Sequence, residues 1–190
     1  MISRLIDTKI DGRQIRVAEL QNMCILLFVG GMHTVTNVTG FSYWQLASMP
    51  ELQQRLVDHP DLIANFVEEG IRMFGVINTP RIVRKDTERF GVKFRKGDMV
   101  LCMLPLAGRD DRVNEDAHHF DIDRKHREYL TFSKGPHLCI GHLLARAELR
   151  ILTEVWLSRI PRFSIQPGAK QKYTTSTGLG IVNLPLVWQP

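Results

Sequence analysis

The sequence has 190 residues, of which 44% are hydrophobic and 24% are charged, a balance typical of a globular protein with one sizeable core rather than a disordered chain. The formal net charge is +5, but no dense block of basic residues is interleaved with aromatic ones, which argues against nucleic-acid binding. Three scattered cysteines and the lack of a signal peptide argue against a disulfide framework, so we expect a cytoplasmic protein.

Residues 17–48 predict one long helix, because apolar and small residues recur there at three- and four-residue steps. At 1.5 Å per residue this helix would be roughly 45 Å long, enough to cross a whole domain. The longest uninterrupted apolar run of the chain, 23–29, is far shorter than the ~20 residues that span a bilayer. We therefore expect no membrane partner.

Two adjacent glycines, Gly30 and Gly31, interrupt this helix and would cost it roughly 1–2 kcal/mol relative to alanines. The hydroxyl of Thr34 can donate to the carbonyl of Gly30, four residues earlier, which tends to bend a helix. The residues alone leave two interpretations open. The glycines either let another element pack closely or widen a groove that holds a small molecule.

Two shorter helices are predicted next, at 50–58 and 61–74. In the second, Glu69 and Arg72 are three residues apart and share one face. Taken alone, such a pair is most often a solvated surface salt bridge worth at most about 1 kcal/mol.

Short alternating strands and turns are predicted over 76–105, followed by an irregular stretch over 107–129 that is rich in arginine, aspartate and histidine. In that stretch, the adjacent side chains of His118 and His119 point in divergent directions. The spacing therefore does not favour a metal site there. The tail, 174–188, predicts a β hairpin that turns near residues 177–180.

The most informative stretch is a ten-residue loop, 132–141, which reads Phe-Ser-Lys-Gly-Pro-His-Leu-Cys-Ile-Gly and is followed by a helix at 142–158. Gly135 and Gly141 allow positive φ, so the loop can curl and offer backbone N–H groups to the sulfur of Cys139. Those groups and the positive end of the following helix favour a thiolate, which can ligate iron. A lone cysteine would more often be structural.

This loop resembles the haem-binding signature of the cytochrome P450 superfamily, Phe-x-x-Gly-x-His-x-Cys-x-Gly, and matches it at every fixed position. The segment around Gly30, Gly31 and Thr34 resembles the oxygen-binding groove of the P450 central helix, with His33 where the family usually places an acid that helps to deliver protons. Glu69 and Arg72 fit the family's buried Glu-x-x-Arg pair.

The resemblance runs from about residue 15 to residue 188 and implies a mainly α fold with small β regions, the C-terminal, haem-loop portion of the P450 fold without its N-terminal half. The segments 160–165 and 184–188 look especially close to soluble bacterial P450s of the camphor-hydroxylase group. In the family, such a chain divides into the long central helix, the Glu-x-x-Arg helix, a β region, a meander with the haem loop at 107–141, the proximal helix and the C-terminal hairpin.

The resemblance also assigns roles to residues. Cys139 would be the axial ligand of the iron of haem b, and the cofactor site would further include Phe132, Gly135, Gly141 and the propionate contacts His137, Arg81 and Thr79. The oxygen groove would comprise Gly30, Gly31, His33 and Thr34. The substrate pocket would be lined by Leu26, Val29, Ile77, Thr177 and Gly178. A purely structural role falls to Glu69, Arg72 and Arg124.

The function implied is a haem-thiolate monooxygenase that hydroxylates a small hydrophobic substrate, for example a terpenoid, with O2 and electrons from an iron–sulfur ferredoxin. A basic face formed by Lys134, Arg146 and Arg150 would dock that ferredoxin. Because the family's N-terminal half is not matched, we expect a fragment of a longer protein, a chain that pairs with a separate N-terminal half or with itself, or a truncated, non-catalytic haem-binding or interaction module.

Overall fold

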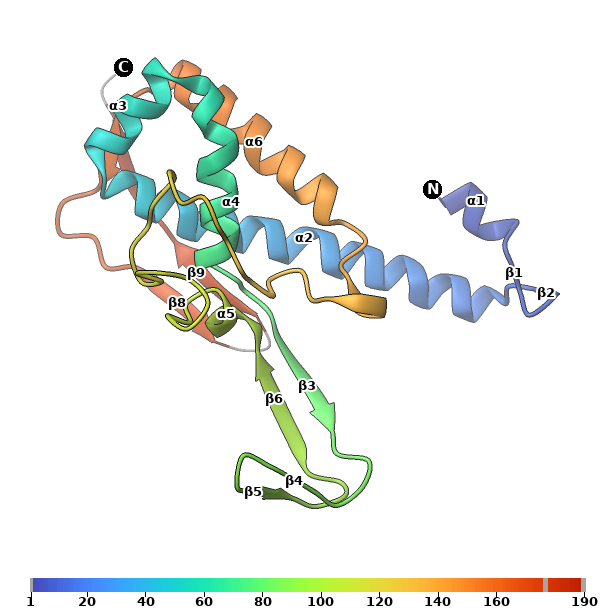
Figure 1. Cartoon of the computed structure of the whole chain (residues 1–190). Coiled ribbons are helices and arrows are strands. Elements are labelled where there is room, and N and C mark those ends of the chain that lie inside the picture. Colours follow the sequence, from blue (N-terminus) through green and yellow to red (C-terminus); the bar gives the residue numbers. More distant parts are fainter. Residues whose placement is uncertain (1, 176–177, 189–190) are drawn as a thin grey trace.

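The computed structural model describes residues 2–175 and 178–188 and is built mainly of helices, with small antiparallel strand pairs at its edges (Figure 1). The helices are α1 (Ile2–Ile6), α2 (Val17–Ala47), α3 (Pro50–Asp58), α4 (Ile63–Met73), α5 (Leu104–Ala107) and α6 (His142–Arg159). The strands are β1 (Lys9–Ile10), β2 (Arg13–Gln14), β3 (Asn78–Ile82), β4 (Thr87–Arg89), β5 (Val92–Phe94), β6 (Met99–Met103), β7 (Phe163–Ile165), β8 (Lys172–Thr175), β9 (Leu179–Asn183) and β10 (Leu186–Trp188).

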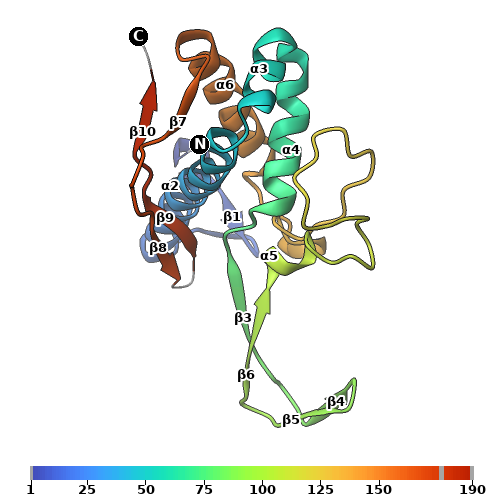
Figure 2. The same ribbon diagram turned by 90° about the vertical axis from the view of Figure 1, so that its left-hand side faces the viewer.

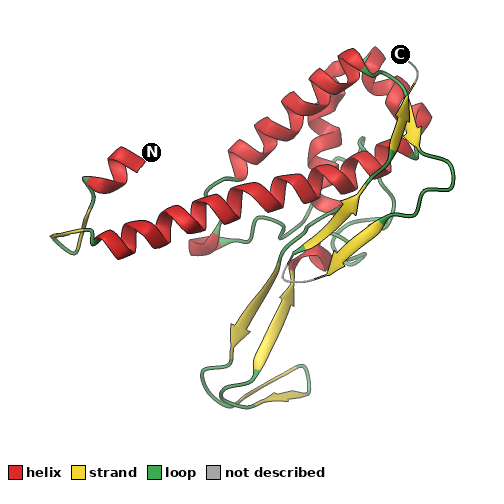
Figure 3. Cartoon of the chain, turned by 180° about the vertical axis from the view of Figure 1, so that it is seen from behind, coloured by secondary structure: helices red, strands yellow, loops and turns green. Residues whose placement is uncertain are grey.

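The hydrophobic core lies around the C-terminal half of α2, where α3, α4 and α6 pack together (Figure 3). Its most deeply buried side chains include Leu46, Leu56 and Phe66, each at most 1% exposed. The N-terminal half of α2 extends beyond this core, and its apolar side chains face outward: Leu26 is 71% exposed and Phe28 66%. The core therefore holds α2 from one end and leaves its glycine pair at the edge of the packed region.

The length and composition of α2 also bear on the membrane. Among the described residues it is the helix long and apolar enough to cross a bilayer, with a mean hydropathy of 1.4 over its best 18-residue window, 6% of which is buried. The core helix of a soluble protein passes the same test, so this observation is weak evidence. The expectation of no membrane partner stays a prediction.

Strands β3 and β6 form an arm that projects from the helical body and ends in the β4–β5 hairpin (Figure 2). In the register of this arm, Thr79 pairs with Cys102 and Arg81 with Val100. Because side chains alternate along a strand, Ile77, Thr79 and Arg81 share one face. The base of that face meets the C-terminal strands, since Ile77 forms a β-bridge with Gly178.

The C-terminal segment differs from the predicted single hairpin over 174–188. The hairpin is formed by β8 and β9, whereas β10 pairs antiparallel with β7, Leu186 lying opposite Ile165. The local alternation of residues cannot reveal this pairing, because it joins segments about twenty residues apart. The expected turn residue Thr177 lies outside the described residues.

The apolar side chains of α6 are only partly buried by the described residues. Leu149, Thr153 and Leu157 are buried, whereas Leu144 is 63% exposed and Leu152 39%. Leu144 faces the cavity described below, and its exposure follows from that position.

Candidate functional site

A cavity of about 320 Å³ lies where the middle of α2, the start of α6, the base of β3 and the cysteine loop (residues 132–141) meet. Its wall combines both motifs that the sequence singles out, although they are about a hundred residues apart. The residues that line it are Gly30, Gly31, Thr34, Val35, Val38, Ile71, Val76, Ile77, Thr79, Leu104, Thr131, Phe132, Ser133, His137, Cys139, Gly141, Leu144, Ala145, Glu148 and Leu149.

The cysteine loop is closed by backbone hydrogen bonds. The N–H of Cys139 donates to the carbonyl of Phe132 at 2.9 Å, and the N–H of Leu138 donates to the carbonyl of Gly135 at 3.0 Å. The tight curve uses positive φ at Ser133 (61°) and Gly135 (64°). These bonds leave Cys139 exposed, just before the N-terminus of α6.

Gly141 does not use the positive φ that a glycine allows, because its φ is −89°. A Cβ at this position would lie 3.8 Å from the sulfur of Cys139, which is ordinary van der Waals contact. The glycine therefore keeps the space beside the sulfur open, and the loop does not need it for its backbone conformation.

The glycine pair of α2 faces open space. A Cβ at Gly30 or at Gly31 would meet no described atom within 4 Å. The expected hydrogen bond from Thr34 Oγ1 to the carbonyl of Gly30 is present at 2.7 Å. No described residue outside α2 packs closely against the pair, and both interpretations stay predictions.

Several predicted site residues lie outside the cavity. His33 is exposed on α2, and the predicted pocket residues Leu26 and Val29 are 71% and 53% exposed. Arg81 is also exposed, and its guanidinium donates to the carbonyl of its own neighbour Pro80 at 2.9 Å. Ile77 and Thr79, by contrast, line the cavity.

Glu69 and Arg72 form a buried ion pair rather than a surface one. Both side chains are 0% exposed, and Arg72 Nη2 lies 2.6 Å from Glu69 Oε1. Arg72 also donates to the carbonyls of Gly108, Ala117 (2.8 Å) and His119 (3.0 Å). The pair therefore ties α4 to the irregular segment 108–131 that leads into the cysteine loop.

Two further arginines contact the same carboxylate. Arg124 Nε lies 3.3 Å from Glu69 Oε1, as expected for its structural role, and Arg127 Nε lies 3.1 Å from Oε2. Burial opposes ionisation of Glu69, but the hydrogen bonds from Arg72 and the backbone of Asp121 and the nearby arginine charges outweigh it and lower its pKa. Arg127 is missing from the sequence prediction, since its distance along the chain from Glu69 gives no local signal.

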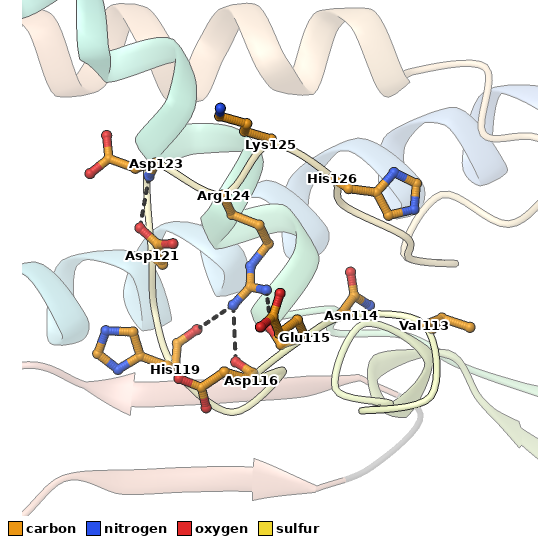
Figure 4. Close-up of a pocket in the computed structure, with 10 residues that line it drawn as sticks. All are labelled: Val113, Asn114, Glu115, Asp116, His119, Asp121, Asp123, Arg124, Lys125 and His126. Carbon is orange, nitrogen blue, oxygen red and sulfur yellow. Dashed lines mark hydrogen bonds between the residues drawn. The ribbon is translucent and has the colours of Figure 1, made fainter.

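Arg124 also closes one side of a second, larger cavity of about 580 Å³ (Figure 4). Its guanidinium donates to the backbone carbonyls of Glu115, Asp116 (3.0 Å) and His119 (3.2 Å). In residues 2–175 and 178–188, no cluster of three histidine, cysteine or acidic side chains is arranged to hold a metal ion. All the residues that line this cavity belong to the irregular segment.

Arg146, which the sequence predicts to face solvent as part of a docking surface, is instead engaged within the chain. Its Nε lies 2.5 Å from Glu68 Oε1, and its Nη2 donates to the hydroxyl of Tyr129 at 2.8 Å. The prediction fails because Glu68 and Tyr129 come from distant parts of the sequence. Lys134 and Arg150 do remain exposed.

The family model for Cytochrome P450 matches residues 1–189. The chain belongs to the cytochrome P450 family. It is 34% identical over 184 residues to a protein of Sinorhizobium fredii named "Probable cytochrome P450 127A1", covering 97% of this chain and 44% of that protein. It is also 34% identical to mycinamicin IV hydroxylase/epoxidase of Micromonospora griseorubida, covering 99% of this chain and 49% of the relative.

The fold agrees with solved P450 structures. The crystal structure of CYP101J2 superposes with a TM-score of 0.92 at 36% identity and covers 99% of this chain and 48% of the solved one. The chain thus forms a partial P450 fold and spans about half the length of the relatives it matches.

The residues at the 320 Å³ cavity fit the haem that the P450 family implies. An exposed thiol on a loop that backbone hydrogen bonds close offers a soft ligand for iron. In the same cavity, a Cβ at Gly30 or Gly31 would meet no described atom within 4 Å, and the apolar side chain of Leu144 is 63% exposed. A flat apolar group would cover these surfaces.

Proposed function

We propose that this chain forms the haem-binding part of a P450 monooxygenase that hydroxylates a small hydrophobic substrate with O2. The observation that carries the proposal is the shared cavity, in which Cys139 lies on one wall and the open groove of Gly30, Gly31 and Thr34 on another. A merely structural cysteine would not need a groove of glycines opposite it.

Cys139 would hold the iron of haem b through its sulfur, and Gly135 and Gly141 would keep the loop compact and the sulfur accessible. When bound, the haem supplies the redox chemistry that activates O2, which the thiolate favours by donating electron density. His137 and Thr79 line the same cavity and would contact the propionates. Arg81 would join them if its side chain turned away from the carbonyl of Pro80, because the forked guanidinium is well suited to bind a carboxylate.

Thr34 would hold a hydrogen-bond donor at the groove. Its hydroxyl hydrogen is directed to the carbonyl of Gly30, so its oxygen lone pairs remain free to accept a hydrogen bond from a group in the groove. His33 precedes it on the solvent-exposed side of α2 and would relay protons from water in place of the family's usual acid. The role of Arg72, Glu69 and Arg124 would be to keep the loop in place.

The substrate is proposed to be hydrophobic and small, because the resemblance implies such a substrate and the cavity wall beside the proposed haem is mainly apolar. The relative from Micromonospora is named as a hydroxylase and epoxidase of mycinamicin IV, which supports oxygen insertion as the reaction class. An iron–sulfur ferredoxin is the proposed electron donor, with the exposed Lys134 and Arg150 as candidate contacts, and the cytoplasm the proposed location.

A second candidate is a non-catalytic haem-binding or interaction module. The observation that favours it is the position of His33, which replaces the family's usual acid and does not line the cavity. Such a module would bind haem without coupling electron transfer to product formation.

The two candidates are separated by supplying the haem-loaded protein with a ferredoxin, its reductase and 18O2, and following a panel of hydrophobic substrates. A monooxygenase places one 18O atom in the product, and Thr34→Ala then lowers the yield of product per electron consumed while Thr34→Ser, which keeps the hydroxyl, does not. Haem binding with electron consumption but no labelled product would instead support the module.

A further inference from the structure

One guanidinium, that of Arg146 on α6, contacts α4, the first turn of its own helix and the segment that leads into the cysteine loop. On one side, it contacts the carboxylate of Glu68 on α4, with Nε 2.5 Å from Oε1 and Nη2 3.5 Å from Oε2. On the other, its Nη1 donates to the carbonyl of His142 at 3.0 Å, at the first turn of α6. The hydroxyl of Tyr129, which precedes the cysteine loop, accepts from Nη2 at 2.8 Å and donates to Glu68 at 2.8 Å.

Arg146 also contacts the cysteine loop itself. The guanidinium carbon of Arg146 lies 4.7 Å from the ring centroid of Phe132, the first residue of the loop. Phe132 in turn supplies the carbonyl that accepts the N–H of Cys139 at 2.9 Å. A short path of contacts therefore leads from the Glu68 carboxylate through Arg146 and Phe132 to the backbone of the cysteine.

The contacts also fix the imidazole of His142. Arg146 Nη1 lies 3.0 Å from Nδ1 of that ring. Because a guanidinium has only donors, this nitrogen must be the acceptor and the ring proton must sit on Nε2. The ring of His142 lies 6.0 Å from the ring of Phe132. The guanidinium of Arg146 thus contacts both rings, one at each end of the cysteine loop.

Only arginine offers this combination of contacts. Its planar fork can pair with a carboxylate, donate to a carbonyl and lie over an aromatic ring at the same time, whereas a lysine ammonium is a point charge on a flexible stem. The side chains of Arg146 and Glu68 are 28% and 32% exposed, so screening by water reduces the net Coulomb energy of the pair. The main effect of the contacts of Arg146 is therefore to restrict the position of the Phe132 ring.

We infer that Arg146 is a positioning residue that, braced by Glu68 and Tyr129, holds Phe132 and thereby sets the backbone geometry of Cys139. The part of this inference that concerns the haem thiolate rests on the proposed function. The part that concerns the loop does not, because every contact in the path belongs to the chain itself.

The test compares Arg146→Lys with Arg55→Lys in the whole chain. Arg55 makes an equally short, bidentate pair with Asp123, at 2.7 and 2.6 Å, on the surface of α3. Amide hydrogen exchange, followed by NMR, reports the Cys139 N–H directly and needs no haem. We expect its protection to fall by about tenfold or more in Arg146→Lys, because charge-assisted hydrogen bonds next to the loop are lost. The Arg55 variant leaves it unchanged.

A residue that merely stabilises the fold would give a different pattern. It would lower protection at Cys139 and at the C-terminal end of α4 in the same proportion, for example at the N–H of Phe74, the residue after α4, which donates to the carbonyl of Gly70 at 2.8 Å. Equal losses at both places, or full protection at Cys139, would overturn the inference. If Arg146→Lys does not fold, Tyr129→Phe removes a single brace and is expected to give a smaller loss at Cys139 with α4 unchanged.

The ferrous–CO spectrum of the haem-loaded variants separates this inference from the proposed function. In the unmodified chain, the red-shifted band of a thiolate ligand supports the function, and Arg146→Lys is expected to transfer part of that band to the blue-shifted form. A red-shifted band that is unaffected by Arg146→Lys contradicts the positioning role and leaves the function intact. A chain without any red-shifted band contradicts the function, and hydrogen exchange still decides the role of Arg146 in the loop.

Discussion

Replacing Glu69 by glutamine is expected to be severely destabilising. The carboxylate is fully buried and accepts five hydrogen bonds. They come from Nε and Nη2 of Arg72, Nε of Arg124, Nε of Arg127 and the N–H of Asp121. A glutamine keeps one acceptor oxygen and turns an NH2 group toward arginine donors, so at least two bonds are lost and the buried arginine charge is left uncompensated. Breaking a buried pair in this way costs about 3–5 kcal/mol.

Urea unfolding of Glu69→Gln measures this loss directly, and thermal unfolding should show a fall in Tm of about 6–20 °C for a chain of this size. Because the pKa of Glu69 is lowered from its ordinary value of 4.5, its contribution is complete above that pH and is lost as the pH falls through the folded-state pKa. The variant should therefore lose less stability than the unmodified chain on acidification. The control is Glu154→Gln, which removes the charge of an exposed ion pair in which Oε1 of Glu154 lies 3.6 Å from Nε of Arg150. This control should cost less than about 0.5 kcal/mol. A loss below about 1 kcal/mol for Glu69→Gln would refute the reasoning.

Three further changes test other parts of the account. Gly108→Ala should destabilise the fold by about 1–3 kcal/mol in urea unfolding, because a Cβ there would overlap the carbonyl oxygen of Arg72 and lie 3.0 Å from its carbonyl carbon. An unchanged urea midpoint would contradict this close approach of the two backbone segments. Gly30→Ala should do the opposite and stabilise the fold by about 0.5–1 kcal/mol, because its Cβ meets open space in a helix, while weakening haem binding in a titration; tighter haem binding would argue against the groove. Burial, together with the nearby carboxylate of Glu68, raises the pKa of Tyr129 to about 12. The unmodified chain should therefore lose stability as the pH rises from about 10 through 12, and Tyr129→Phe should lose less. Equal losses in the two proteins would show that Tyr129 is not buried against Glu68.

The sequence predicts those parts of the site that are encoded locally. The cysteine loop is ten consecutive residues with fixed spacing, and the bond from Thr34 to Gly30 follows from the four-residue repeat of a helix. The apolar spacing predicts a helix at 17–48 for the same reason, and α2 forms at Val17–Ala47. The family and its partial fold follow from these local motifs and are confirmed by the comparisons.

The parts that the sequence misses depend on distant contacts. The roles of Arg127 and Arg146 are set by Glu69 and Glu68 on α4, about sixty and eighty residues away, and a basic residue in isolation gives no sign of such a partner. The pairing of β10 with β7 is equally non-local. The exposure of Leu144 has another cause. The spacing of apolar residues along a helix shows which face of the helix is apolar, but it does not show what covers that face.

The central claim is that Cys139 can ligate haem iron in this chain, and the reduced, carbon-monoxide difference spectrum tests it most directly. Cys139→Ser is the matched variant, since the exposed side chain is not packed in the core and its replacement should leave the Tm nearly unchanged. The account predicts a strongly red-shifted Soret band for the haem-loaded unmodified chain and the loss of that band in Cys139→Ser. The same red-shifted band in both proteins would show that another residue binds the iron, and its absence from both would show that this chain does not form a haem-thiolate site.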